Sequence, residues 1–109
     1  MISAEFKMGK TLSLTIKGHG DKLVCASASI LAYTLAQNIK DSEGLCDKTR
    51  LKLEEGDTIV SCTPKEESWG ALRAIFSAII RGIDLLSANF PEEISLQRVI
   101  PKHRTSRSR

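Results

Sequence analysis

The sequence has 109 residues, the length of one domain, and its hydrophobic (41%) and charged (27%) fractions are ordinary for a globular protein. No apolar run approaches the length that spans a bilayer, and we find no signal peptide, so we expect a cytoplasmic protein. The net charge of +3 comes from the C-terminal end, because four of the 16 basic residues and no acidic residue lie in 102–109.

Without that end, 12 basic residues face 13 acidic ones, so the basic character does not belong to the rest of the chain. We therefore expect residues 1–101 to form one domain and residues 102–109 to be a disordered basic tail. The tail is either a solvated terminus without a special role or a weak RNA contact that acts through counterion release.

The cysteine and histidine content gives no sign of a disulfide framework or a metal site. The three cysteines, Cys25, Cys46 and Cys62, are odd in number and include no C-x-x-C pair. The paired ligand spacings that identify a zinc site are also missing. We expect no metal and no cofactor.

The first half of the chain predicts a hairpin followed by a helix. Residues 2–8 and 11–16 read as two strands around a turn at Gly9-Lys10, the second with alternating apolar positions. Residues 17–21 end the strand, and from 22 to about 40 apolar residues recur at three- and four-residue steps, as on one face of a helix. These positions are Val24, Ala28, Leu31, Leu35 and Ile39.

The second half repeats this order. A polar stretch from 41 to 48, which contains Cys46, precedes strands at 50–54 and 57–62, a helix from about 66 to 87 and a short strand within 94–100. Hairpins that alternate with helices predict an α+β two-layer sandwich, with an antiparallel or mixed sheet of four to five strands and two helices on one face.

The candidate chemistry lies where the first hairpin meets the first helix. Cys25 falls in the expected first turn of that helix, where unpaired N–H groups and the helix dipole stabilise a thiolate and an oxyanion. His19 lies six residues earlier, and a tight turn brings its imidazole within reach of the thiol. The pair then acts as nucleophile and general base.

Neighbouring residues have two interpretations each. Gly18 and Gly20 leave room around the histidine for a substrate backbone, and Ser29 lies one helical turn after Cys25. Asp21 either orients the histidine or caps the helix, and capping is the better interpretation. Cysteine in an alanine-rich helix is also commonly a small buried residue, and Ser29 an ordinary helical serine.

The segment from Ile16 to Gly20 (IKGHG) with the segment from Leu23 to Ser29 (LVCASAS) resembles the signature of the ribosomal-processing cysteine protease (Prp) family. The resemblance implies Cys25 as nucleophile, His19 as base and Ser29 as the serine of the motif. It further implies a small α+β sandwich, usually a homodimer. The implied activity is removal of a short N-terminal extension from ribosomal large-subunit protein twenty-seven, or cleavage of a phage structural protein.

Two departures from that signature concern the segment between the histidine and the cysteine. This segment is shorter than in typical members, where it forms a mobile loop over the site, and Lys22 replaces the acid that stands three residues before the cysteine. They keep open a second hypothesis, a catalytically silent relative that binds a ribosomal protein or RNA. A third is a dimeric structural module with an inert Cys25.

Overall fold

The computed structural model describes residues 1–100, so the tail predicted for 102–109 lies outside the described residues. The elements follow the predicted order of two hairpins, two helices and a last strand. They are β1 (Ile2–Met8), β2 (Leu12–Lys17), α1 (Lys22–Asp41), β3 (Cys46–Glu54), β4 (Asp57–Pro64), α2 (Trp69–Asn89) and β5 (Ile94–Val99), with short 3₁₀ helices at Glu43–Leu45 and Glu66–Ser68.

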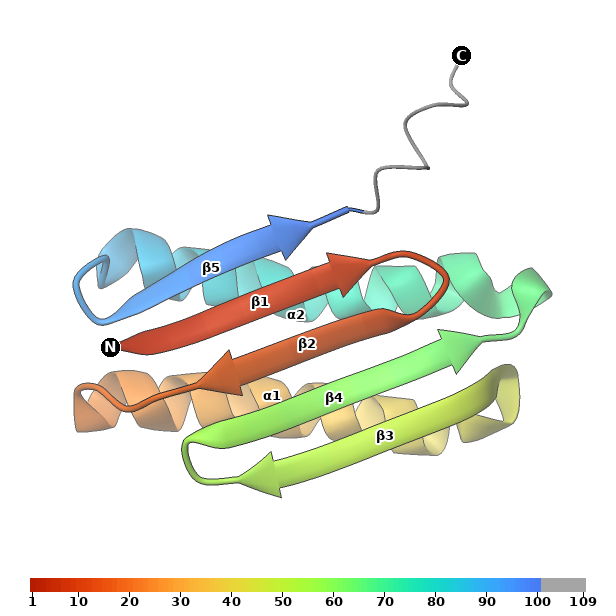
Figure 1. Ribbon diagram of the computed structural model, residues 1–109, viewed down its shortest axis with the longest axis horizontal. Helices are drawn as coiled ribbons and strands as arrows, with labels where there is room; N and C mark the ends of the chain where they lie inside the picture. Colours follow the sequence, from red (N-terminus) through yellow and green to blue (C-terminus); the bar gives the residue numbers. More distant parts are fainter. Residues whose placement is uncertain (101–109) are drawn as a thin grey trace, which may run out of the picture.

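The strands form one mixed sheet in the order β3-β4-β2-β1-β5. The neighbours β3–β4, β4–β2 and β2–β1 are antiparallel, whereas β5 lies parallel to β1. Both helices cover the same face of this sheet (Figure 1). The prediction of an α+β sandwich with a mixed sheet and two helices on one face is confirmed.

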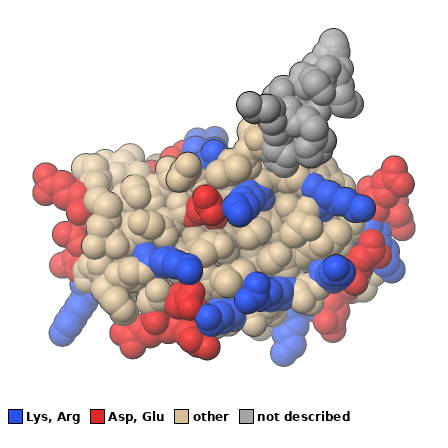
Figure 2. Space-filling model, viewed as in Figure 1, with Lys and Arg blue, Asp and Glu red and all other residues tan. Residues whose placement is uncertain are grey.

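The core lies between the sheet and the helices, and alternation along the strands builds it. On β2, every second residue is buried, and Leu12 and Leu14 are fully enclosed. From the helix layer, Phe76 of α2 stacks on Phe6 of β1 with ring centroids 5.9 Å apart. The other face of the sheet carries intermixed basic and acidic side chains (Figure 2). One helix-covered face and one polar face explain the period-two pattern of the strands.

The two helices pack closely at a glycine. A Cβ at Gly82 of α2 would lie 2.8 Å from Cδ2 of Leu31 on α1, so only a glycine lets that leucine approach the α2 backbone so closely. Leu31 is half-buried rather than enclosed, while the other predicted stripe residues of α1 are buried. Neither α1 nor α2, nor any other described helix, is long and apolar enough to cross a membrane.

The predicted boundaries are wrong at the start of β3. Cys46, which the sequence places in a polar stretch, is the first residue of this strand, and its side chain packs against the core. The pattern hides the strand because β3 lies at the edge of the sheet, where most of its residues are exposed and charges are favoured. The second helix begins at Trp69, three residues later than predicted, after a 3₁₀ turn.

Candidate active site

Cys25 lies at the start of α1, on the second turn rather than the first. The helix begins at Lys22, and the Asp21 side chain caps it by accepting a 2.9 Å hydrogen bond from the N–H of Leu23. Cys25 is therefore the fourth helical residue, and its own N–H donates to the Asp21 carbonyl at 2.9 Å. Its own amide is thus not among the unpaired N–H groups that the sequence analysis expects around the thiol.

The Cys25 sulfur lies against the backbone of Gly20. The Gly20 N–H donates to Sγ at 3.3 Å, and the Gly20 carbonyl oxygen is 3.6 Å from Sγ. The side chain is half-buried, with part of its surface open to solvent. The thiol is therefore held at a defined place by the residue just before the helix cap.

The segment between β2 and α1 is anchored at both ends. The Gly18 N–H donates to the Gly56 carbonyl at 3.1 Å, and the Asp21 N–H donates to Glu93 Oε1 at 2.7 Å. Gly18 has φ +96°, and a Cβ there would collide with the carbonyl oxygen of Met1. This position requires glycine for a structural reason, beyond the open space that the sequence analysis assigned to it.

Gly20 is also closely surrounded. A Cβ at Gly20 would lie 2.8 Å from the same Glu93 Oε1 that accepts the Asp21 N–H. A side chain there would press on the carboxylate that fixes the helix cap. Both glycines flanking His19 therefore serve the packing of this segment.

His19 is exposed and lies over the turn of the second hairpin. A Cβ at Gly56 would be 2.5 Å from His19 Nε2, so the imidazole edge rests on the glycine of the β3–β4 turn. Among the described residues, none forms a hydrogen bond or ion pair with the imidazole. A direct bond between His19 and Cys25 stays a prediction.

His19 and Cys25 nevertheless line one cavity of about 310 Å³, which Ser29 also lines. Ser29 is exposed one turn along α1 from Cys25. Of the six residues singled out from the sequence, Gly18, His19, Cys25 and Ser29 thus share this cavity. Asp21 and Gly20 lie beside it and hold the helix start and the sulfur.

Part of the cavity lining consists of residues that the sequence pattern did not single out. Glu54, Glu55 and Gly56 come from the β3–β4 turn, and Tyr33 comes from the next turns of α1. The Glu-Gly pair of the turn is visible in the sequence, but nothing local relates it to His19, more than 30 residues earlier. The cavity is thus a cleft between α1 and the second hairpin, with two carboxylates at the histidine end.

The other two cysteines lie apart from this cavity. Burial, and then the neighbouring Cys46 thiol, raise the pKa of Cys62 to about 12, so Cys62 is a protonated core thiol at neutral pH. Cys46 is half-buried, and its thiol is 3.8 Å from the carbonyl oxygen of Ser42. Within residues 1–100 no three His, Cys, Asp or Glu side chains are grouped as a metal site.

The chain is thus a small α+β protein in which a cysteine near a helix start lines a cleft beside the turn of a hairpin. No protein-family model matches the chain, and no match to a curated protein is found. Solved structures do match over nearly the whole length. SMU.848 from Streptococcus mutans is 21% identical, with a TM-score of 0.70 over 93% of this chain and 96% of that one.

The ribosomal processing protease Prp from Staphylococcus aureus also shares the fold. In complex with a covalently linked product peptide it is 16% identical, with a TM-score of 0.69 over 90% of this chain and 99% of that one. In complex with a substrate peptide it is 15% identical, with a TM-score of 0.67 over the same shares. The chain therefore has a Prp-like fold.

Proposed function

We propose that this protein is a cysteine endopeptidase of the Prp type. The observation that carries the proposal is that Cys25 and His19, which match the Prp signature, line one cleft in a Prp-like fold. Cys25 is the nucleophile and His19 the base, without a cofactor. Gly18, Gly20 and Asp21 hold the two in place, and Ser29 supports the cleft.

The proposed mechanism is acyl transfer. The imidazole of His19 takes the thiol proton, the Cys25 sulfur attacks the scissile carbonyl, and the C–N bond breaks as the same proton passes to the leaving amine. Water, deprotonated by His19, then attacks the thioester, the carboxylic acid product leaves, and the proton returns to the Cys25 sulfur. This requires the exposed imidazole to turn from Gly56 toward the sulfur within the cleft. The Gly20 N–H, already 3.3 Å from the sulfur, holds the nucleophile during that exchange.

The proposed substrate is an extended peptide. It is the N-terminal extension of ribosomal large-subunit protein twenty-seven, or a related segment of a phage structural protein, and the reaction takes place in the cytoplasm. The complexes of the Staphylococcus aureus protease with product and substrate peptides support a protein substrate. The cleft is open along α1 and beside the edge strand β3, as an extended segment requires.

We also propose that the protein forms a homodimer through its helix layer. From Leu23 to Ile39, α1 carries no charged residue. Leu23 and Ile30 of this segment, and Leu85 of α2, are each more than half exposed. An uncharged face with exposed leucine and isoleucine is typical of a subunit interface. Measuring the molar mass by light scattering tests this proposal. We expect the wild type to be a dimer and the Leu23→Glu variant to be a monomer.

The decisive experiment measures the alkylation rate of Cys25 from pH 5 to 9, by peptide mass spectrometry, in wild type and in His19→Ala. We expect fast alkylation of Cys25 in the wild type and slow alkylation in His19→Ala over this pH range. The second histidine of the chain provides the matched control, and His103→Ala is expected to behave like wild type. Ordinary thiol reactivity in all three proteins contradicts the protease.

The alternative is a catalytically silent relative that binds a ribosomal protein or RNA. The observation that favours it is that the imidazole rests on Gly56 without a hydrogen bond to Cys25. Incubation with a peptide carrying the N-terminal extension separates the two candidates. A protease cleaves this peptide, and its Cys25→Ala variant does not. A silent relative leaves the peptide intact and binds it equally well with cysteine or alanine at position 25. Deleting residues 102–109 tests the RNA contact, which is expected to be sensitive to salt.

A further inference from the structure

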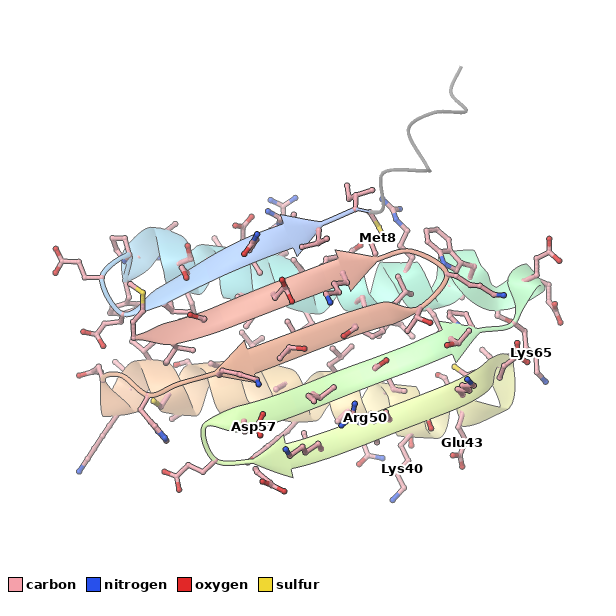
Figure 3. The ribbon with its side chains drawn as sticks, in the orientation of Figure 1. Met8, Lys40, Glu43, Arg50, Asp57 and Lys65 are labelled. Atoms are coloured by element: carbon pink, nitrogen blue, oxygen red, sulfur yellow. The ribbon has the colours of Figure 1, made fainter. Side chains whose placement is uncertain are left out.

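A second cavity lies at the other edge of the sheet and shares no residue with the cleft that contains Cys25. It has a volume of about 190 Å³ and opens between α2 and the ends of β1 and β5. Figure 3 shows Met8, one of its lining residues, at the end of β1 beside β5. The inference drawn from this cavity does not rest on the proposed protease activity.

Three arginines surround this cavity. Arg73 and Arg81 come from α2, eight residues apart, and Arg98 comes from β5. One carboxylate is close to them, because Asp84 Oδ2 accepts a hydrogen bond from Arg98 at 3.1 Å. The described part of the cavity therefore carries an excess of two positive charges.

These guanidinium groups have donors to spare. The Nε of Arg73 donates to the thioether of Met8 at 3.2 Å, a weak acceptor, and its guanidinium lies 6.0 Å from the Trp69 ring. Arg81 forms no ion pair or hydrogen bond with another residue of 1–100. An anion in the cavity would be a stronger partner for Arg73 than the thioether of Met8, and it would give Arg81 a charged partner.

The floor of the cavity is apolar. Phe6 and Ile80 form its base and are almost fully buried, and Met8, Val99 and Ile100 complete the wall. Ser77 adds one hydroxyl on α2, in sequence midway between Arg73 and Arg81. The apolar floor and the arginines at the rim together fit a ligand that has an aliphatic body and an anionic end.

We propose that this cavity binds an aliphatic carboxylate, either the C-terminal residue of a peptide that ends in a leucine-like side chain or a free short-chain acid. The carboxylate lies between Arg81 and Arg73, and the aliphatic part covers Phe6 and Ile80. The volume supports a single residue, since it is smaller than the roughly 300–1,000 Å³ typical of larger ligands. A phosphate fills the rim and leaves the apolar floor uncovered, so it binds more weakly.

The test is a two-dimensional NMR titration of the full chain with matched probes. The probes are 4-methylpentanoate and its amide, a short peptide ending in leucine as acid and as amide, and inorganic phosphate. We expect the acids to shift the resonances of the Arg81 Nε–H and of the backbone N–H groups of β5 and α2. The probes that carry an amide in place of the carboxylate are expected to bind at least about tenfold more weakly. A peptide acid that binds more tightly than 4-methylpentanoate identifies a protein C terminus as the source, and the reverse order identifies a free acid.

Variants localise the binding. Arg81→Gln removes an exposed side chain that has no hydrogen-bond or ion-pair partner within 1–100, and it is expected to weaken binding of both acids about tenfold. Arg98→Gln provides a second variant, from β5. Arg50→Gln is the matched control, since Arg50 lies on β3 at the opposite edge of the sheet (Figure 3). The proposal is overturned if acids and amides bind alike, if phosphate binds as tightly as the acids, or if Arg50→Gln weakens binding as much as Arg81→Gln.

Discussion

Replacing Gly56 by alanine tests whether the β3–β4 turn sets the position of His19. Gly56 has φ +76°, which costs an L-residue about 1–2 kcal/mol. The added Cβ would lie 2.5 Å from His19 Nε2, and forcing the ring off its rotamer adds about 0.5–1.5 kcal/mol. The smaller entropy of the unfolded alanine chain returns about 0.4–1 kcal/mol. We expect the free energy of unfolding to fall by about 1–2.5 kcal/mol in balance.

The matched control is Gly44→Ala. No heavy atom lies within 4 Å of a Cβ at Gly44, and its φ is not positive, so the change in stability is expected within about 0.5 kcal/mol of zero. Urea unfolding followed by circular dichroism measures both variants, and the His19 Cε1–H resonance reports the ring. Equal unfolding midpoints for the two variants, or an unmoved His19 resonance in Gly56→Ala, would refute the contact between the ring and the turn.

Three further predictions concern the packing around the site and the core. In α2, the Cβ of Gly70→Ala would lie in open space, so this variant is expected to be more stable by up to about 1 kcal/mol. The Cβ of Gly82→Ala would press on Leu31 of α1, so this variant is expected to show no such gain in stability. Thermal unfolding compares the two variants. Glu93→Ala removes the acceptor of the helix-cap amide, so hydrogen exchange of that amide is expected to accelerate, and an equal effect in Glu92→Ala would contradict this. Because the pKa of Cys62 is raised from 9.0 to about 12, the folded state holds a proton that the unfolded chain loses. Stability is then expected to fall by up to about 1.4 kcal/mol per pH unit above pH 9, and a Cys62→Ala variant with the same pH slope would refute it.

The sequence predicts the elements better than their arrangement. Leu12, Leu14 and Ile16 alternate, and Val24, Ala28, Leu35 and Ile39 follow a helical period, so a local pattern is enough to identify β2 and α1. For β5, the alternation of Ile94 and Leu96 fits either direction and either edge of the sheet. Its parallel place beside β1 depends on the crossover through α2, and no local pattern specifies that.

The candidate site shows the same division. Cys25 and His19 are six residues apart, so their placement near one cavity follows from a single turn. Gly56 and Glu93 lie 37 and 74 residues after His19 in the sequence, and each forms one hydrogen bond with the segment between β2 and α1. A single contact of this kind produces no periodic pattern in the sequence. A local pattern therefore places the proposed nucleophile and base near one cavity, whereas the residues that hold the segment between them lie too far along the chain to be recognised.

These anchors give the short segment between His19 and Cys25 a physical role. In the family signature a longer, mobile loop joins the two residues, whereas here Gly18 to Asp21 form the whole connection between strand and helix. The Gly56 carbonyl holds one end and the Glu93 carboxylate holds the other. Closure of this connection over a bound peptide would have to break one of these two hydrogen bonds. The Cys25 sulfur is already held by the Gly20 N–H, so the group left to adjust is the exposed imidazole of His19. If Cys25 and His19 act as proposed, we expect rotation of that one side chain, rather than closure of a loop, to bring the imidazole to the thiol.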